Sequence, residues 1–81
     1  MKLIVYTKSG CPWCRAVVDF LNERKVLFEE REVRRNKEWF DEMVAKSGQE
    51  KAPTVDLDGE ILADTDVEAV ERFLKEKKII S

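Results

Sequence analysis

The stretch Cys11-Pro12-Trp13-Cys14 follows the apolar run Leu3-Ile4-Val5-Tyr6 and contains the only two cysteines of the 81-residue chain. Pro12 suits the first turn of a helix, because the N–H that it lacks would have no partner there. Residues i and i+3 of such a turn lie on one face at roughly 5 Å, within the Cα separation that a disulfide needs. The two cysteines are therefore placed to form and break a disulfide with little backbone movement, as a redox centre requires.

Apolar patterns predict the elements on either side of the cysteines. Residues 2–7 are typical of a buried strand, and residues 12–24 carry an apolar stripe at helical spacing. Residues 26–33 predict a second strand, whose charges suit a solvated sheet edge. Asn36 is a candidate N-cap for a helix over residues 37–47. The first half of the chain thus alternates strand and helix, and a right-handed crossover makes its two strands parallel.

The period of the pattern changes in the second half of the chain. The runs Thr54–Leu57 and Glu60–Ala63 flank Asp58-Gly59, a strong signal for a two-residue hairpin turn. A last helix is predicted to start at Thr65, whose hydroxyl forms a capping box with the glutamate three positions later. The prediction is one α/β domain over residues 1–81, of order β-α-β-α-β-β-α, with a mixed four-stranded sheet.

Composition excludes several classes of function. The chain has 17 acidic and 15 basic residues, so its net charge of −2 argues against a general affinity for nucleic acid or anionic membranes. The chain lacks histidine, which excludes a His-based metal site and a Cys-His catalytic pair. Two cysteines alone also cannot complete a four-ligand zinc site within one chain, so we expect no metal site.

The sequence shows no targeting segment and no apolar stretch long enough to span a membrane, so we expect a cytoplasmic location. Thiols are kept reduced there, and a Cys-x-x-Cys pair is then catalytic rather than structural. The alternative is a structural disulfide in a small secreted protein. Such proteins usually carry more cysteines, which disfavours that reading.

The order of elements, with Cys11-Pro12-Trp13-Cys14 after the first strand and Ala52-Pro53-Thr54 before the third, resembles the glutaredoxins of the thioredoxin-like superfamily. The segment Thr7–Cys14 is the most specific part of the resemblance, and Ser47-Gly48-Gln49 also resembles the family. The resemblance covers nearly the whole chain. It implies a thioredoxin-like (glutaredoxin) fold with helices on both faces of the sheet. It further implies that Pro53 follows a cis peptide bond and faces the cysteines.

Two segments depart from the usual glutaredoxin pattern. Lys51-Ala52-Pro53 stands where the family usually has Thr-Val-Pro, and Ala63-Asp64 stands where it usually has Gly-Gly. An Ala-Pro pair is closer to the glutaredoxin-like redoxins that serve ribonucleotide reductase. The electron donor that reduces the protein is therefore left open between glutathione and a flavoprotein.

Cys11 is the expected nucleophile. Its position at the start of a helix exposes it to unpaired backbone N–H groups, and Lys8 and Arg15 add nearby positive charge. These groups favour the thiolate, which is the form that attacks a disulfide. Cys14 lies one turn deeper on the apolar stripe and is expected to be less exposed and less ionised. Cys11 would form a mixed disulfide with the substrate, and Cys14 would then attack Cys11 to release the reduced product.

Six further residues are candidate positions for binding substrate or glutathione: Lys8, Trp13, Ala52, Pro53, Thr65 and Asp66. Trp13 offers a flat apolar wall beside the substrate sulfur. The backbone of Ala52 is free to pair with an extended peptide, although Pro53 also suits the start of any strand. The resemblance implies that Lys8 meets a glutathione carboxylate and that Thr65 and Asp66 hold its γ-glutamyl end. In the simpler local interpretation, Lys8 is solvated and Thr65 and Asp66 cap a helix.

The predicted function is a glutathione-dependent thiol–disulfide oxidoreductase that reduces protein disulfides or glutathione mixed disulfides. No tightly bound cofactor is expected, because the electrons reside on the two sulfurs. The expected partners are glutathione and disulfide-containing proteins, and the expected oligomeric state is a monomer.

Three alternatives remain open. The first is a redoxin reduced by a thioredoxin-reductase-type flavoprotein, acting as electron donor to ribonucleotide reductase. The second is an iron–sulfur carrier dimer that holds its cluster with two Cys11 thiolates and two glutathiones, which a stiff Pro12 disfavours. The third is a non-catalytic interaction module, which the intact spacing of the cysteines disfavours.

Overall fold

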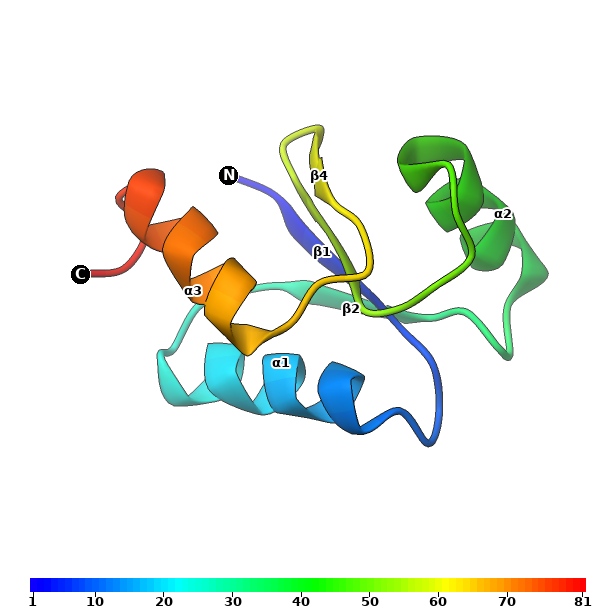
Figure 1. Cartoon of the computed structure of the whole chain (residues 1–81), viewed down its shortest axis with the longest axis horizontal. Helices are drawn as coiled ribbons and strands as arrows, with labels where there is room; N and C mark the ends of the chain where they lie inside the picture. Colours follow the sequence, from blue (N-terminus) through cyan, green and yellow to red (C-terminus); the bar gives the residue numbers. More distant parts are fainter.

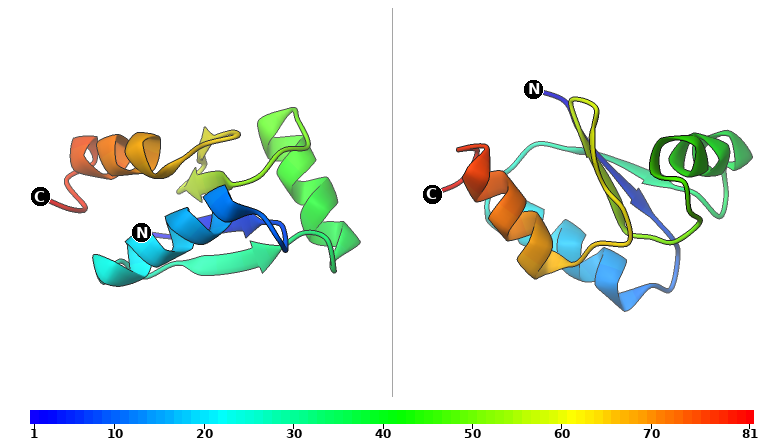
Figure 2. Two further views of the ribbon diagram at one scale, coloured as in Figure 1. Left: turned by 60° about the horizontal axis from the view of Figure 1, so that its bottom comes forward. Right: turned by 45° about the horizontal axis from the view of Figure 1, so that its top comes forward.

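The computed structural model describes residues 1–81 and has the predicted order of elements. They are β1 (Leu3–Thr7), α1 (Pro12–Glu23), β2 (Glu29–Glu32), α2 (Lys37–Ser47), β3 (Thr54–Leu57), β4 (Glu60–Leu62) and α3 (Val67–Glu76). Figure 1 shows α1 and α3 on one side of the sheet and α2 on the other, and Figure 2 gives two further views. The predicted placement of helices on both faces is confirmed.

The four strands form one mixed sheet in the order β2-β1-β3-β4. β1 pairs in parallel with β2 and antiparallel with β3, and β4 is antiparallel to β3. β1 lies between two strands and beneath helices on both faces, so all five of its residues are buried. β2 and β4 are the two edge strands, as the charged sequence of β2 and the hairpin predicted.

Side chains of β1 alternate between two apolar clusters, one on each face of the sheet. The cluster under α1 and α3 comprises Leu3, Val5, Val17, Leu21, Val26, Val55, Leu57, Val70 and Leu74. The smaller cluster under α2 comprises Ile4, Tyr6, Val33 and Met43. One helix and fewer apolar residues cover the α2 face, so polar contacts carry more of its packing.

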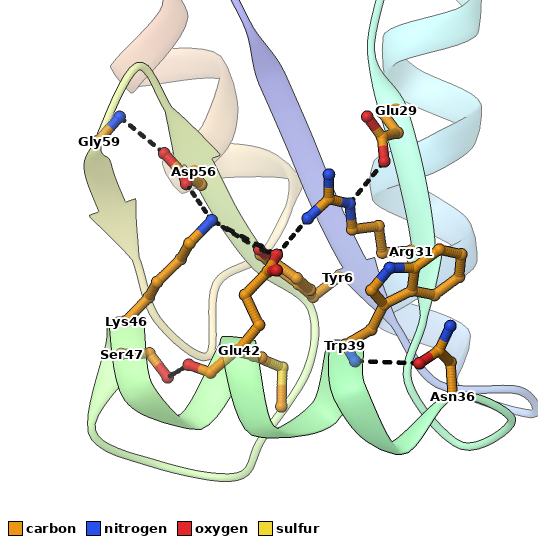
Figure 3. A network of polar contacts seen from close by, with 11 residues as sticks. Tyr6, Glu29, Arg31, Asn36, Trp39, Glu42, Lys46, Ser47, Asp56 and Gly59 are labelled. Carbon is orange, nitrogen blue, oxygen red and sulfur yellow. Dashed lines mark hydrogen bonds and ion pairs between the residues drawn. The ribbon is translucent and has the colours of Figure 1, made fainter.

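A network of polar side chains joins α2 to the sheet (Figure 3). The Tyr6 hydroxyl donates to Glu42 and accepts from Lys46 Nζ at 2.7 Å. Lys46 also donates to Asp56 at 2.7 Å, and Arg31 donates to Glu42. Burial, together with the hydrogen bond to Glu42, raises the pKa of Tyr6. The Arg31 side chain, predicted to be solvated at a sheet edge, is therefore part of the contact between sheet and helix.

The second strand is shorter than the predicted range of residues 26–33. Its first residue is Glu29, because Val26 lies in the turn that follows α1: its amide donates to the carbonyl of Leu21 at 3.0 Å, and its side chain is buried in the core. Leu27 is 85% exposed and packs on neither cluster. The apolar run at 26–28 therefore predicted a strand where the chain makes a helix-terminating turn.

The start of α3 also differs from the prediction. The N-cap is Asp66, whose carboxylate accepts from the Ala69 amide at 2.9 Å, and the helix begins at Val67. The Thr65 hydroxyl is buried without a hydrogen-bond partner, so the capping box predicted at Thr65 is wrong. The Thr65 amide instead donates to the carbonyl of Pro53 at 2.8 Å, which holds this residue one position outside the cap.

Candidate functional site

The first turn of α1 surrounds the sulfur of Cys11 with polar backbone groups. Cys11 is the N-cap of α1, and its Sγ accepts from the Cys14 amide at 3.2 Å. Pro12 follows at the first helical position, as predicted. The Cys11 side chain is partly exposed, so a substrate disulfide has access to it. The Cys14 N–H therefore points at the sulfur that is exposed to a substrate.

The sulfur of Cys14 lies in a different environment. Cys14 is 3% exposed, and its Sγ accepts from the Lys8 amide at 3.5 Å. Burial, and next the hydrogen bond with Cys11, raises the pKa of Cys14 to about 12. Both cysteines are free thiols in this structure. The pair is therefore asymmetric, with one accessible sulfur at a helix end and one buried thiol that stays protonated at neutral pH.

The loop before β3 brings a second segment to Cys11. The Ala52–Pro53 peptide bond is cis, as the resemblance implied. The Cys11 thiol donates weakly to the Ala52 carbonyl at 4.0 Å, and the Pro53 carbonyl accepts from the Thr65 amide. Cys11, Ala52, Pro53 and Thr65 are therefore brought together, although they come from three separate parts of the chain.

Trp13 and Asp66 make no hydrogen bond to either sulfur. Trp13 is 65% exposed, which leaves its ring open to solvent beside the cysteines. The Asp66 carboxylate is used as the cap of α3. The roles of these residues toward a ligand remain predictions.

The side chain of Gln49, which the sequence did not single out, holds the loop before β3 in place. Its amide nitrogen donates at 3.1 Å to the Lys51 carbonyl and to the Thr54 hydroxyl. The Thr54 hydroxyl in turn donates to the Lys51 carbonyl at 2.9 Å. These bonds fix the loop on both sides of Ala52 and Pro53, and so they fix the carbonyl that faces Cys11.

A groove of about 280 Å³ opens beside the cysteines, on the β2 side of β1. Its lining residues are Thr7, Lys8, Ser9, Gly10, Cys11, Cys14, Arg15, Val18, Glu30 and Glu32. Lys8 and Arg15, the two cations predicted near Cys11, both line it. The groove is not lined by Ala52, Pro53 or Thr65, because these residues lie on the β3 side of β1. Cys11 therefore lies between two different surfaces, this groove and the loop that carries Ala52.

Glu32 was also missed by sequence reasoning. Its carboxylate accepts from the amides of Ser9 at 2.9 Å, Arg34 at 3.1 Å and Arg35 at 3.1 Å. Burial alone would raise the pKa of Glu32, but these backbone hydrogen bonds outweigh it and the pKa is lowered. Glu32 thereby joins the loop before Cys11 to the loop before α2.

The structure contains no group of three or more His, Cys, Asp or Glu side chains arranged to hold a metal ion. None of its helices has both the length and the apolar sequence needed to cross a membrane.

The fold and the paired cysteines define the class of protein. Residues 3–62 match the family model described as glutaredoxin, which covers more than half of the chain. The chain therefore belongs to the glutaredoxin family, and its fold is thioredoxin-like. The family resemblance recognised in the sequence is confirmed.

Three relatives illustrate the similarity. Glutaredoxin 3 from Escherichia coli strain K12 is 29% identical over 62 residues, which cover 76% of this chain and 75% of the relative. The thioredoxin-like protein BC3987 has a TM-score of 0.83 at 32% identity, covering 90% of this chain and 100% of that one. NrdH-redoxin from Escherichia coli has a TM-score of 0.74 at 24% identity, covering 89% of this chain and 93% of that one, and shares the fold.

Proposed function

We propose that the protein is a thiol–disulfide oxidoreductase that uses Cys11 as nucleophile and Cys14 as resolving thiol. The observation that carries this proposal is the asymmetry of the two sulfurs. Cys11 is accessible at the N-terminus of α1, whereas Cys14 is buried with its pKa raised to about 12. In such a pair the accessible sulfur makes the first attack, and the buried sulfur reacts only in the second step.

The reaction proceeds in two exchanges. The Cys11 thiolate attacks one sulfur of the substrate disulfide, a Cys11–substrate disulfide forms, and the other substrate sulfur leaves as a thiolate. Cys14 then loses its proton and attacks Cys11, which releases the second substrate thiolate. The Cys11–Cys14 disulfide has lost two electrons and the substrate has gained them. No tightly bound cofactor takes part.

Glutathione is the proposed electron donor, acting on the Cys11–Cys14 disulfide through the same exchange in reverse. The proposed contacts are the Ala52 backbone beside Cys11, the exposed ring of Trp13, and the start of α3 at Thr65 and Asp66. The adjacency of Ala52 to Cys11 and of Thr65 to Pro53 supports this arrangement. We further propose that the protein acts as a cytoplasmic monomer.

A second candidate donor is a thioredoxin-reductase-type flavoprotein. NrdH-redoxin, which shares the fold, is described as a glutaredoxin-like protein with a thioredoxin-like activity profile. The Ala-Pro pair at Ala52-Pro53, where glutaredoxins usually have Val-Pro, supports the same assignment. In that case the substrate would be the disulfide of a ribonucleotide reductase.

Turnover with each donor tests the proposal. Insulin disulfides and a glutathione mixed disulfide are offered with glutathione and glutathione reductase, or with NADPH and thioredoxin reductase. Cys11→Ser is expected to abolish all exchange. Cys14→Ser is expected to abolish dithiol reduction but to retain removal of glutathione. Wild-type rates in the Cys11→Ser protein would show that the assigned roles are wrong.

A further inference from the structure

A second groove, here named the basic groove, lies next to the cysteine pair. Its volume is about 370 Å³, and its lining residues are Lys8, Val33, Arg34, Lys37 and Phe40. Three of the five residues are cations and none is an acid, although acidic residues outnumber basic ones in the chain by 17 to 15. Positive charge gathered over an apolar floor favours a partner that carries negative charge.

Lys8 connects the basic groove to the redox centre. Its carbonyl accepts from the Cys11 amide at 3.2 Å, and its own amide donates to Cys14 Sγ at 3.5 Å. Lys8 also lines the groove that contains both cysteines. A molecule in the basic groove therefore contacts a residue that also lines the groove of the cysteines.

The walls of the basic groove are held in place by Glu32. Its carboxylate accepts from the Ser9 amide on one loop and from the Arg34 amide on the other. The Val33 amide also donates to the Thr7 carbonyl at 2.9 Å, which extends the pairing of β1 with β2. The loop that carries Arg34 is therefore fixed relative to the loop that carries Lys8, and a preorganised surface loses less entropy on binding.

The cations of the basic groove are available to a partner. Neither Lys8 nor Arg34 is in an ion pair, and Lys37 pairs only with Asp41 while remaining 86% exposed. On the other side of β1, the exposed Asp64 and Asp66 stand at the start of α3. The excess of positive charge is therefore confined to the basic groove, at the loop before α2, whereas the start of α3 carries acidic side chains.

We propose that the basic groove receives an acidic segment of a substrate protein, next to the disulfide that Cys11 attacks. This inference rests on the proposed function and names its class of substrate. Glutamate or aspartate side chains of the segment pair with Lys8, Arg34 and Lys37. Their methylene groups pack on Val33 and Phe40. The segment thereby positions the neighbouring sulfur for Cys11.

A single-turnover assay tests the groove without an electron donor. Cysteine peptides are prepared as mixed disulfides with 2-nitro-5-thiobenzoate, with glutamate, glutamine or lysine on both sides of the cysteine. The Cys11 thiolate of the reduced protein attacks the peptide sulfur, the S–S bond breaks, and coloured nitrothiobenzoate leaves with the electron pair. The glutamate peptide is expected to react roughly 3- to 10-fold faster than the glutamine peptide, and the advantage is expected to shrink at high salt.

Charge reversal in the groove provides the second arm. Arg34→Glu and Lys37→Glu are expected to remove the preference for the glutamate peptide while leaving the rate with the glutamine peptide nearly unchanged. The matched control is Arg72→Glu, which makes the same change of charge at an exposed position of α3. Circular dichroism checks that each variant is folded. Arg34→Gln and Lys37→Gln give the same comparison without reversing charge.

The outcomes separate the two proposals. Equal rates with glutamate and glutamine peptides, or an unchanged preference in Arg34→Glu and Lys37→Glu, would overturn the acidic-segment proposal while the redox function stands. Arg34→Glu and Lys37→Glu could also slow the reaction with glutathionyl nitrothiobenzoate as much as the reaction with the glutamate peptide. That result would assign the groove to the glutathione carboxylate instead. Absence of nitrothiobenzoate release from every peptide would contradict the proposed function itself.

Discussion

The two cysteines have the same covalent structure, and their environments alone make them chemically different. Cys11 Sγ accepts a hydrogen bond from the Cys14 amide at the N-terminus of α1. Cys14 is 3% exposed, and its pKa is raised to about 12. Alkylation requires the thiolate. Iodoacetamide at neutral pH is therefore expected to label Cys11 at least about tenfold faster than Cys14. Peptide mass spectrometry of the reduced protein measures both rates, and equal labelling would contradict the assigned asymmetry.

Glu32 is the second residue whose role is decided by its contacts. Replacing it with alanine leaves three backbone amides without their acceptor. Water reaches these surface amides and lessens the loss, so Glu32→Ala is expected to lower the free energy of unfolding by about 1–2 kcal/mol. Glu32→Gln keeps one carbonyl acceptor and is expected to lose less. Urea unfolding measures both, with Glu38→Ala, an exposed acid in the first turn of α2, as the control.

At the scale of elements, the start of α3 distinguishes two neighbouring residues. Asp66 caps the helix, and Asp66→Ala is expected to lower the free energy of unfolding by about 1 kcal/mol. Thr65→Val is expected to be neutral or stabilising, because it replaces a buried hydroxyl that has no partner. Denaturant unfolding of the two variants compares them directly. A larger loss in Thr65→Val would restore the capping role that the sequence predicted for Thr65.

The elements also show which structural features the sequence could predict. Each helix and strand was predicted from periodic patterns within a few neighbouring residues. The cysteine pair was recognised from its spacing. Asn36 caps the start of α2 and Gly48 caps its end, as these residue types favour. The second strand was predicted too long because Val26 is apolar. A valine can be buried either in a strand or in a turn that packs on the core, and a local pattern cannot distinguish the two.

At the scale of the whole molecule, the features that escaped prediction are contacts between distant parts of the chain. Glu32 bonds to Ser9, 23 residues away, and Tyr6 bonds to Glu42, 36 residues away. In the sequence, Glu32 cannot be told from an ordinary surface charge, and Tyr6 cannot be told from an ordinary core aromatic. The pairing depends on the register of β1 with β2 and on where α2 packs. Such contacts are visible only once the tertiary structure is known.

These distant contacts predict how the whole protein responds to acid. Glu42 accepts from Tyr6 and Arg31, and these partners lower its pKa despite its burial. Burial would raise the pKa of Asp56, but the hydrogen bonds from Lys46 and Gly59 outweigh it and the pKa is lowered. The pKa of Glu32 is likewise lowered. Each carboxylate therefore holds its proton less tightly in the folded state than in the unfolded state.

A lowered carboxyl pKa stabilises the folded protein above the pKa of the unfolded chain, and this stabilisation is lost as the pH falls through the folded pKa. The melting temperature is therefore expected to be nearly constant from about pH 7 to about pH 5 and to fall steeply toward about pH 3. Asp56→Asn removes one of the titrating groups, so its free energy of unfolding is expected to change less over the acidic range than that of the parent. Asp19→Asn, which replaces an exposed carboxylate of α1 in no ion pair, is the matched control. An identical slope in Asp56→Asn and the parent would show that Asp56, one carboxylate of the network in Figure 3, does not contribute to acid unfolding.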